Sequence, residues 1–239
     1  MILKEIIKKI IFKEKYNSES YIKYLRKLGS KIGDNCIIYV PTKTLIDTQN
    51  PYMIEIGDNV KISEGVKILT HDFSWCVTSA LDGIITGSVG SVNIGNNVFV
   101  GMNAIILKNV NIGDNVIIGA GSIVTHDCEE NYVYAGNPAK KIMSIKDYHE
   151  KRKRNQINDV KKIVKNYYNI NRKLPDEKVL REYIFLFNKG NNKSDEIVEE
   201  ILNDSGHYEM CEKALEINNP QYKSLEELLN AFNVEDRRE

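Results

Sequence analysis

The chain contains four histidines, the side chains best suited to moving protons near neutral pH. Only His71 lies at a break in the sequence pattern, where a regular repeat of aliphatic residues stops and a polar loop begins. An imidazole there can take a proton from a hydroxyl group and pass it to a leaving group. The alternative is an ordinary loop histidine that is hydrogen-bonded to nearby backbone, so the elements around His71 must decide its role.

Metal and disulfide chemistry are not indicated. The four cysteines are widely spread and form no C-x-x-C pair, which argues against a disulfide framework and a thiolate zinc site. We therefore expect no metal and a reducing, cytoplasmic environment. Lys and Arg number 33, as do Asp and Glu, so no global basic field attracts nucleic acid.

A repeat with a period of six residues organises the middle of the chain. From residue 94 onward an aliphatic side chain returns at every sixth position, at Ile94, Val100, Ile106, Ile112, Ile118 and Val124. The same pattern starts earlier at Ile32 and Ile56, each followed by Gly-Asp-Asn. Ile94 follows Ile56 by 38 residues, which is not a multiple of six. Something is therefore inserted between Leu69 and Val92.

Period six fits neither an α-helix nor a simple alternating strand. It does fit short strands of a prism-shaped coil, with Gly, Asn and Asp at the corners, where they tolerate the required backbone angles. The aliphatic residues then point inward and stack from coil to coil in a one-dimensional core. The sequence predicts a mainly β protein with a parallel β-helix over residues 29–143 and a loop excursion over residues 72–91.

Helical segments flank this repeat. Residues 1–28 begin with isoleucines and leucine at helical spacing, but lysines interrupt every apolar run, which excludes a membrane-spanning helix and argues against a signal peptide. We expect this N-terminal helix to dock on the rest of the protein, with a peripheral membrane contact as the alternative. Residues 144–239 form a helical extension. Pro175 opens a helix in it whose apolar face contains Val179, Leu180, Tyr183, Ile184 and Phe187, and Ser224 with Glu227 forms a capping box.

Two further segments complete the pattern. Residues 68–75 read ILTHDFSW, and residues 135–140 read AGNPAK. With the repeat, they resemble the bacterial hexapeptide-repeat acyltransferases, above all the capsule or lipopolysaccharide O-acetyltransferases and the maltose and galactoside acetyltransferases. The resemblance implies a left-handed coil, a homotrimer, acetyl-CoA as acyl donor and a sugar or glycan acceptor.

The resemblance also implies roles for single residues. His71 would be the general base that takes the proton from the acceptor hydroxyl during direct attack on the thioester, without a covalent enzyme intermediate. Asp47 would contact the acceptor, and Trp75 would stack on its sugar ring unless it packs on the prism wall. The partner that orients His71 stays open at this stage, because Asp72 is adjacent in sequence but need not reach the ring.

Coenzyme contacts are expected from the last coils, where small residues let a pantetheine arm lie flat. The predicted coenzyme-binding residues are Gly101, Met102, Ala120, Thr125, His126 and Lys140. Here His126 replaces the lysine usual in the sugar acetyltransferases, and Phe99 replaces a tryptophan.

Two alternatives use the same kind of coil. A carbonic anhydrase of the γ class needs three zinc-binding histidines, but His149 and His207 lie outside the repeat. A non-catalytic scaffold would have no need to interrupt its own core. The resemblance therefore implies an acyl-CoA-dependent O-acetyltransferase, while the identity of the acceptor and the length of the acyl group stay open.

Overall fold

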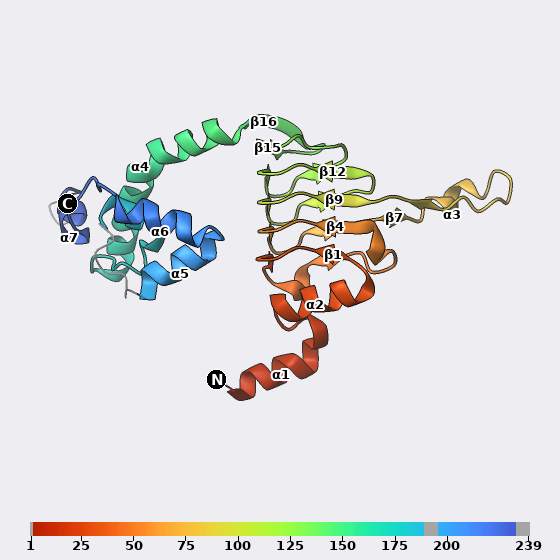
Figure 1. The fold of residues 1–239 in the computed structure, drawn as a ribbon, viewed down its shortest axis with the longest axis horizontal. Helices are drawn as coiled ribbons and strands as arrows, with labels where there is room; N and C mark the ends of the chain where they lie inside the picture. Colours follow the sequence, from red (N-terminus) through yellow and green to blue (C-terminus); the bar gives the residue numbers. More distant parts are fainter. Residues whose placement is uncertain (1, 189–195, 233–239) are drawn as a thin grey trace. The chain divides into compact units, whose positions relative to one another are not determined.

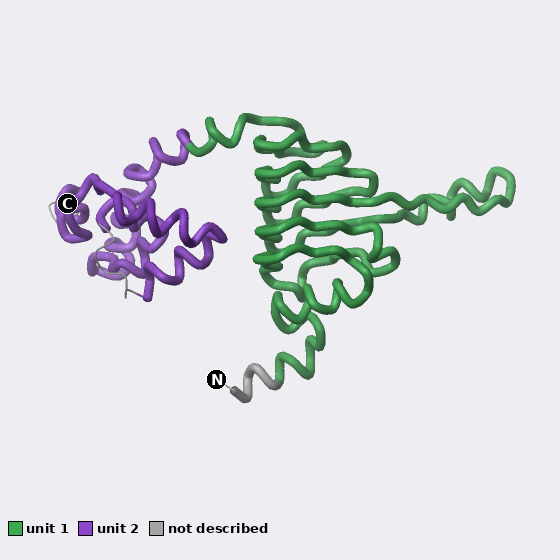
Figure 2. The backbone as a smooth tube through the Cα atoms, in the orientation of Figure 1, with its two compact units in different colours: residues 1–149 green, residues 150–239 purple. Residues whose placement is uncertain are grey.

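The computed structural model describes residues 2–188 and 196–232. Within it the chain divides into two compact units, residues 1–149 and 150–239 (Figure 2). We describe each unit by itself. The parts of the predicted helical segments at residues 1, 189–195 and 233–239 lie outside the described residues.

The first unit is a three-sided parallel β-helix, in which each full coil contributes one strand to each of three sheets (Figure 1). We name these sheets sides A, B and C. Side A contains β1 (Lys31–Ile32), β4 (Ile54–Ile56), β9 (Val92–Ile94) and β12 (Val110–Ile112). Side B contains β2 (Ile37–Ile38), β5 (Lys61–Ile62), β10 (Phe99–Val100), β13 (Ile117–Ile118), β15 (Tyr132–Ala135) and β16 (Lys140–Ser144). Side C contains β3 (Leu45–Ile46), β6 (Lys67–Ile68), β11 (Ile105–Ile106) and β14 (Ile123–Val124).

The strand register confirms the predicted period and its interruption. Ile56 pairs with Ile94 across the 38-residue step, and Ile94 pairs with Ile112 one uninterrupted coil later. The aliphatic residues form three buried columns, one on each side of the prism. The columns are Ile32, Ile56, Ile94 and Ile112 on side A; Ile38, Ile62, Val100 and Ile118 on side B; and Ile46, Ile68, Ile106 and Val124 on side C. The left-handed sense of the coil stays a prediction.

Asparagines turn the chain at one corner. Asn59, Asn97 and Asn115 adopt left-handed backbone angles, with φ of 55°, 54° and 55°, a conformation that asparagine tolerates better than most residues. Their side-chain amides also bond from coil to coil, Asn59 to Asn97 at 3.0 Å and Asn97 to Asn115 at 2.8 Å. The predicted corners are therefore confirmed, and a side-chain ladder reinforces this one.

The glycines of the two Gly-Asp-Asn segments serve a different purpose from the one predicted. Gly33 and Gly57 have no left-handed backbone angle. A Cβ atom on Gly33 would lie 2.6 Å from the carbonyl carbon of Gly57, and one on Gly57 would lie 2.8 Å from that of Gly95. Glycine is required at these positions because the coils stack too closely for a side chain. The backbone angles themselves do not require glycine.

Two helices and short 3₁₀ turns precede or interrupt the coils. They are α1 (Ile2–Phe12), η1 (Lys13–Lys15), α2 (Ser18–Leu28), η2 (Pro41–Lys43) and η3 (Pro51–Met53). Helix α2 starts at Asn17, whose side chain accepts a hydrogen bond from the Ser20 N–H, and ends at Gly29 with φ of 114°. Three of its side chains enter the prism core: Tyr21, Ile22 and Leu25. Helix α2 therefore closes the first end of the core.

The predicted excursion leaves the prism as an extended arm (Figure 1). It starts and ends with a two-stranded antiparallel ladder, β7 (His71–Asp72) against β8 (Ser88–Val89), and carries the short helix α3 (Trp75–Thr78). The coil resumes directly afterwards with β9, so the core stacks without a gap across the insertion.

The second unit is helical and has its own core. Its elements are α4 (Ile145–Asn171), which starts in the first unit, η4 (Arg181–Leu186), α5 (Glu196–Ser205), α6 (Tyr208–Glu216) and α7 (Leu225–Asn230). The helix expected after Pro175 is a 3₁₀ segment that starts only at Arg181, although Leu180 and Ile184 are buried as the pattern predicts. The predicted cap of α7 is present, because the Ser224 hydroxyl accepts the Glu227 N–H at 3.2 Å. Among the described residues no helix is long and apolar enough to cross a membrane.

Candidate active site

Two strands of side C bring Asp47 and His71 together. Strand β3 pairs in register with β6, so the residues that follow the two strands leave the prism at the same corner. The Asp47 N–H donates to the Ile68 carbonyl at 3.0 Å, which places Asp47 directly below the start of the arm. Its Oδ2 atom lies 2.6 Å from Nδ1 of His71. This contact supplies the orienting partner that the sequence left open.

The Asp47 carboxylate is buried and fully engaged. Besides His71, Oδ2 accepts the Thr70 N–H at 3.0 Å and the Thr70 hydroxyl at 2.5 Å, and Oδ1 accepts the Gln49 N–H at 2.9 Å. Burial by itself raises the pKa of Asp47, but the hydrogen bonds from Thr70, Gln49 and His71 outweigh it and hold that pKa below its usual value. Asp47 is therefore ionised at neutral pH.

An ionised carboxylate fixes the tautomer of the neutral imidazole. Because a carboxylate can only accept, the proton of neutral His71 lies on Nδ1, where it donates to Asp47. Nε2 then carries the free lone pair. The side chain of His71 is 21% exposed, so it lies at the surface of the prism with a buried anchor behind it. This arrangement suits a general base.

A lysine from the next coil holds the base of the arm. Lys108 follows β11, and its Nζ donates to Oδ2 of Asp72 and to the Ser88 hydroxyl, one on each strand of the β7–β8 ladder. Hydrogen bonds from Lys108 and then Ser74 hold the pKa of Asp72 well below its usual range. Asp72 thus pairs with Lys108. Lys108 is not among the residues predicted from the sequence, although extending the coil register places it beside Thr70, at the same corner as His71.

Aromatic side chains flank the imidazole. The ring of His71 meets Phe73 edge-on at 5.6 Å between centroids, and Phe73 lies 5.8 Å from Trp75. Phe73 is 60% exposed, whereas Trp75 is half-buried. Trp75 is the aromatic residue predicted from the sequence, whereas Phe73, which was not predicted, is the one in contact with the imidazole.

Three of the predicted coenzyme residues, Gly101, Met102 and Ala120, lie at the corner between sides B and C. Met102 and Ala120 follow β10 and β13 in successive coils, and the Gly121 N–H donates to the Met102 carbonyl at 2.7 Å. Both side chains are exposed. Gly101 packs so tightly that a Cβ would lie 2.6 Å from the Ala120 nitrogen, whereas a Cβ on Gly121 would meet nothing within 4 Å. The edge is therefore smooth and open to solvent.

The remaining predicted coenzyme residues lie elsewhere. Thr125 and His126 directly follow β14, at the opposite edge of side C, and the Thr125 hydroxyl lies 2.7 Å from Nδ1 of His126. Lys140 is exposed and starts β16, where it pairs with Ala135. Below, the His71 corner means Asp47, Thr70, His71 and Lys108, and the small-residue corner means Met102, Ala120 and Gly121. One chain places these corners at opposite edges of side C.

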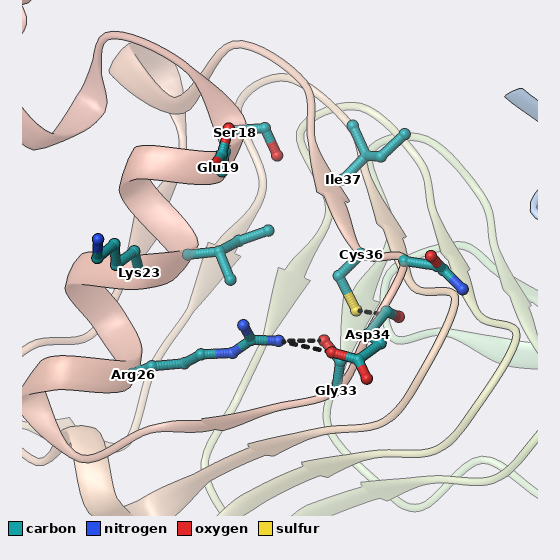
Figure 3. Close-up of a pocket in the computed structure, with 10 residues that line it drawn as sticks. Ser18, Glu19, Lys23, Arg26, Gly33, Asp34, Cys36 and Ile37 are labelled. Atoms are coloured by element: carbon teal, nitrogen blue, oxygen red, sulfur yellow. Dashed lines mark hydrogen bonds and ion pairs between the residues drawn. The ribbon is translucent and has the colours of Figure 1, made fainter. Parts of the chain in front are cut away.

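A hollow of about 600 Å³ lies at the other end of the prism, between α2 and the first coil (Figure 3). Arg26 reaches across it and donates to the carbonyls of Ile32 and Gly33 at 2.9 and 2.7 Å. None of the predicted site residues lines it. Arg26 there ties α2 to the first coil. Within residues 2–188 and 196–232, no group of three or more His, Cys, Asp or Glu side chains is arranged to hold a metal ion.

Comparison with known proteins supports the six-residue repeat that was predicted from the sequence. The family described as bacterial transferase hexapeptide (six repeats) matches residues 91–126. Protein CapG of Staphylococcus aureus is 45% identical over 128 residues, which cover 53% of this chain and 73% of that protein.

Two solved acetyltransferase structures are similar to part of this chain. A maltose O-acetyltransferase from Clostridium difficile 630 has 29% identity and a TM-score of 0.43, covering 59% of this chain and 81% of its own. A hexapeptide-repeat acetyltransferase from Vibrio cholerae has 18% identity and a TM-score of 0.45, covering 59% and 89%. Because both TM-scores are below 0.5, the family assignment depends on the matched repeat and on the sequence identity with CapG. The chain belongs to the bacterial hexapeptide-repeat transferase family.

Proposed function

We propose that the protein is an acetyl-CoA-dependent O-acetyltransferase that acts on a hydroxyl group of a sugar or a surface-polysaccharide precursor. The observation that carries this proposal is the Asp47–His71 pair, placed where the coil gives way to the arm. Membership of a transferase family supports the reaction class. The similar structure named as a maltose O-acetyltransferase makes a sugar the first acceptor to test.

In this mechanism His71 handles the proton. Nε2 takes it from the acceptor hydroxyl while that oxygen attacks the thioester carbonyl carbon. The bond between carbon and sulfur breaks, and His71 returns the proton to the departing sulfur, so that the products are the acetyl ester and free coenzyme A. Asp47 keeps the ring in the reactive tautomer and stabilises the imidazolium that forms between the two transfers. Atoms and charge balance without a covalent enzyme intermediate.

The small-residue corner would hold the acyl donor. Its exposed Met102 and Ala120 and the open space at Gly121 suit a thin, flexible arm with amide groups that bond to backbone. The bound donor supplies the activated acetyl group. Lys140, which is exposed, is available to its phosphates, and Thr125 with His126 offers polar contacts at the other edge of side C.

The aromatic residues of the arm would receive the acceptor. Phe73 presents an exposed ring beside the imidazole, and the ring of Trp75 lies 5.8 Å from that of Phe73. Sugar rings stack on such faces through their apolar C–H groups. The direct acceptor contact predicted for Asp47 is untested, and we propose orientation of His71 as its main task because His71, Thr70 and Gln49 use both of its oxygens.

A shared site follows from the separation of the two corners. If His71 and the donor must meet, and one chain holds them at opposite edges of side C, a second chain has to supply one of them. A homotrimer of prisms meets this need, with the arm of one chain lying over its neighbour. We place the enzyme in the cytoplasm, where acetyl-CoA is available and the four cysteines stay unpaired.

The direct test is release of free thiol from acetyl-CoA in the presence of a chelator, with maltose, galactosides, amino sugars and serine as acceptors. The proposal expects thiol release that depends on a sugar hydroxyl and is indifferent to the chelator. Serine as the only acceptor would refute the acceptor class. Activity that disappears with the chelator and returns with zinc would favour a metalloenzyme and refute the mechanism.

A further inference from the structure

Helix α1 presents apolar side chains that the prism does not cover. Ile10 and Ile11 are 71% and 62% exposed, and Ile7 and Phe12 are exposed as well. Helix α2 supplies the side chains that enter the core, and α1 lies beyond it (Figure 1). The docking of the N-terminal helix on the rest of the protein, expected from the sequence, is therefore not seen for these residues.

The three exposed isoleucines form one face, and Phe12 lies outside it. At 100° per residue, Ile7, Ile10 and Ile11 lie within an arc of about 100°, and Lys9 points to the opposite side. An apolar stripe opposite basic residues is the pattern of helices that lie in a lipid–water interface. With 11 residues the helix is about 16 Å long, too short to cross a hydrocarbon core of about 30 Å.

The base of the helix is anchored to the prism. Lys15 donates to the Thr44 carbonyl at 2.8 Å, and its ammonium group lies 4.7 Å from the centre of the Tyr21 ring. Tyr21 is itself buried in the core. Helix α1 is thus tied at its C-terminal end while its isoleucine face stays in solvent.

Charge favours a lipid surface over a second copy of the chain. Residues 1–15 contain five lysines and two glutamates, whereas the whole chain is balanced at 33 and 33. The rest of the chain therefore has 28 basic and 31 acidic residues, so the positive charge is concentrated around α1. Two such helices placed face to face would repel each other, whereas anionic headgroups attract them.

We propose that α1 is a membrane-surface anchor that seats Ile7, Ile10 and Ile11 among the acyl chains of an anionic leaflet, with its lysines at the lipid phosphates. One short helix gives weak, reversible binding that salt reduces. The anchor would keep the prism at a membrane surface. This inference stands apart from the acetyltransferase proposal, since it does not use the His71 corner.

The test is flotation of the purified full chain with vesicles of phosphatidylcholine alone and of phosphatidylcholine with phosphatidylglycerol at a ratio of three to one. The first variant is Ile10→Glu/Ile11→Glu. The matched control is Ile170→Glu/Ile217→Glu, which changes two isoleucines of the second unit that are 80% and 86% exposed. Both variants add the same charge and remove the same side chains.

We expect at least tenfold more bound wild-type protein on the anionic vesicles than on the neutral ones, and a loss of at least tenfold in the α1 variant alone. Equal losses in both variants would trace binding to net charge and overturn the proposal. So would unchanged binding of the α1 variant or absence of wild-type binding. If the wild type stays unbound while the α1 variant has a lower mass in light scattering, the isoleucine face joins copies of the chain instead.

Discussion

The two edges of side C differ in burial, polarity and rigidity. At the His71 corner a buried carboxylate accepts four hydrogen bonds, and Lys108 clamps the base of the arm. At the small-residue corner the side chains of Met102 and Ala120 are exposed and Gly121 has open space beside it. A group that must act as a base needs a fixed tautomer, whereas a surface that holds a long flexible substrate needs smoothness. The repeat supplies the same backbone frame at both edges, and the residues at each corner give that frame a different chemical character.

The largest expected effect is at the base itself. His71→Ala should lower turnover by roughly 10²–10⁴-fold and leave the melting temperature nearly unchanged, because Asp47 keeps its three other hydrogen bonds. Steady-state thiol release and thermal melting measure the two quantities. His149→Ala, at an exposed position, is the control. A variant that loses activity only because it fails to fold would show that His71 is structural.

The second largest effect is expected at Asp47, the carboxylate that we propose orients His71. Asp47→Asn keeps the shape of the side chain but can donate to Nδ1, which would move the imidazole proton to Nε2 and remove the free lone pair. We expect turnover to fall about 10²-fold with KM for acetyl-CoA unchanged. Asp34→Asn, an exposed carboxylate of the same prism, is the control. Normal turnover in Asp47→Asn would separate Asp47 from the chemistry.

A substitution at the small-residue corner should change the KM for acetyl-CoA. Ala120→Trp fills the smooth corner with a bulky ring, so we expect KM for acetyl-CoA to rise by about tenfold or more, the loss of roughly 1.4 kcal/mol of binding. The hydrogen bonds of the His71 corner should persist. Ala231→Trp, at an exposed position in the second unit, controls for the added ring. An unchanged KM would remove the small-residue corner from the donor site.

The smallest effect concerns stability against pH. A depressed carboxyl pKa stabilises the fold above the unfolded-state value of about 4 and loses that contribution as pH falls through the folded-state value. The wild type should therefore exceed Asp47→Asn by about 1 kcal/mol in free energy of unfolding at pH 7. That gap should narrow below pH ~4. Denaturant unfolding at several pH values measures it, and a gap that widens in acid would contradict the assignment.

The sequence predicts the frame of this molecule because the frame is local. Each coil needs an inward aliphatic residue and a tolerant corner residue at fixed spacing, so Ile56, Ile94 and Asn97 can be assigned by counting. The excursion is visible for the same reason, as a break in that count. The contact between Asp47 and His71 is not local. It depends on a step of 22 residues between Ile46 and Ile68, which includes η3, and no period reveals that step.

The site is predictable only where a single residue breaks the pattern. His71 meets that condition, whereas Lys108 and Phe73 do not, because a lysine after a strand and an aromatic residue in a loop are common. The helix expected after Pro175 shows the same limit. Its apolar spacing correctly marks Leu180 and Ile184 as buried, but tertiary packing sets the backbone as a 3₁₀ segment.

Mixed oligomers of two defective variants test whether the active site is shared between chains. His71→Ala supplies an intact small-residue corner, and Ala120→Trp supplies an intact His71 corner. After co-refolding, with chain exchange verified by mass, some oligomers should contain one interface in which both corners are wild type. We predict that the mixture regains part of the wild-type activity, well above either variant alone. A fully exchanged mixture no more active than its parents would place both corners of a working site in one chain and refute the shared site.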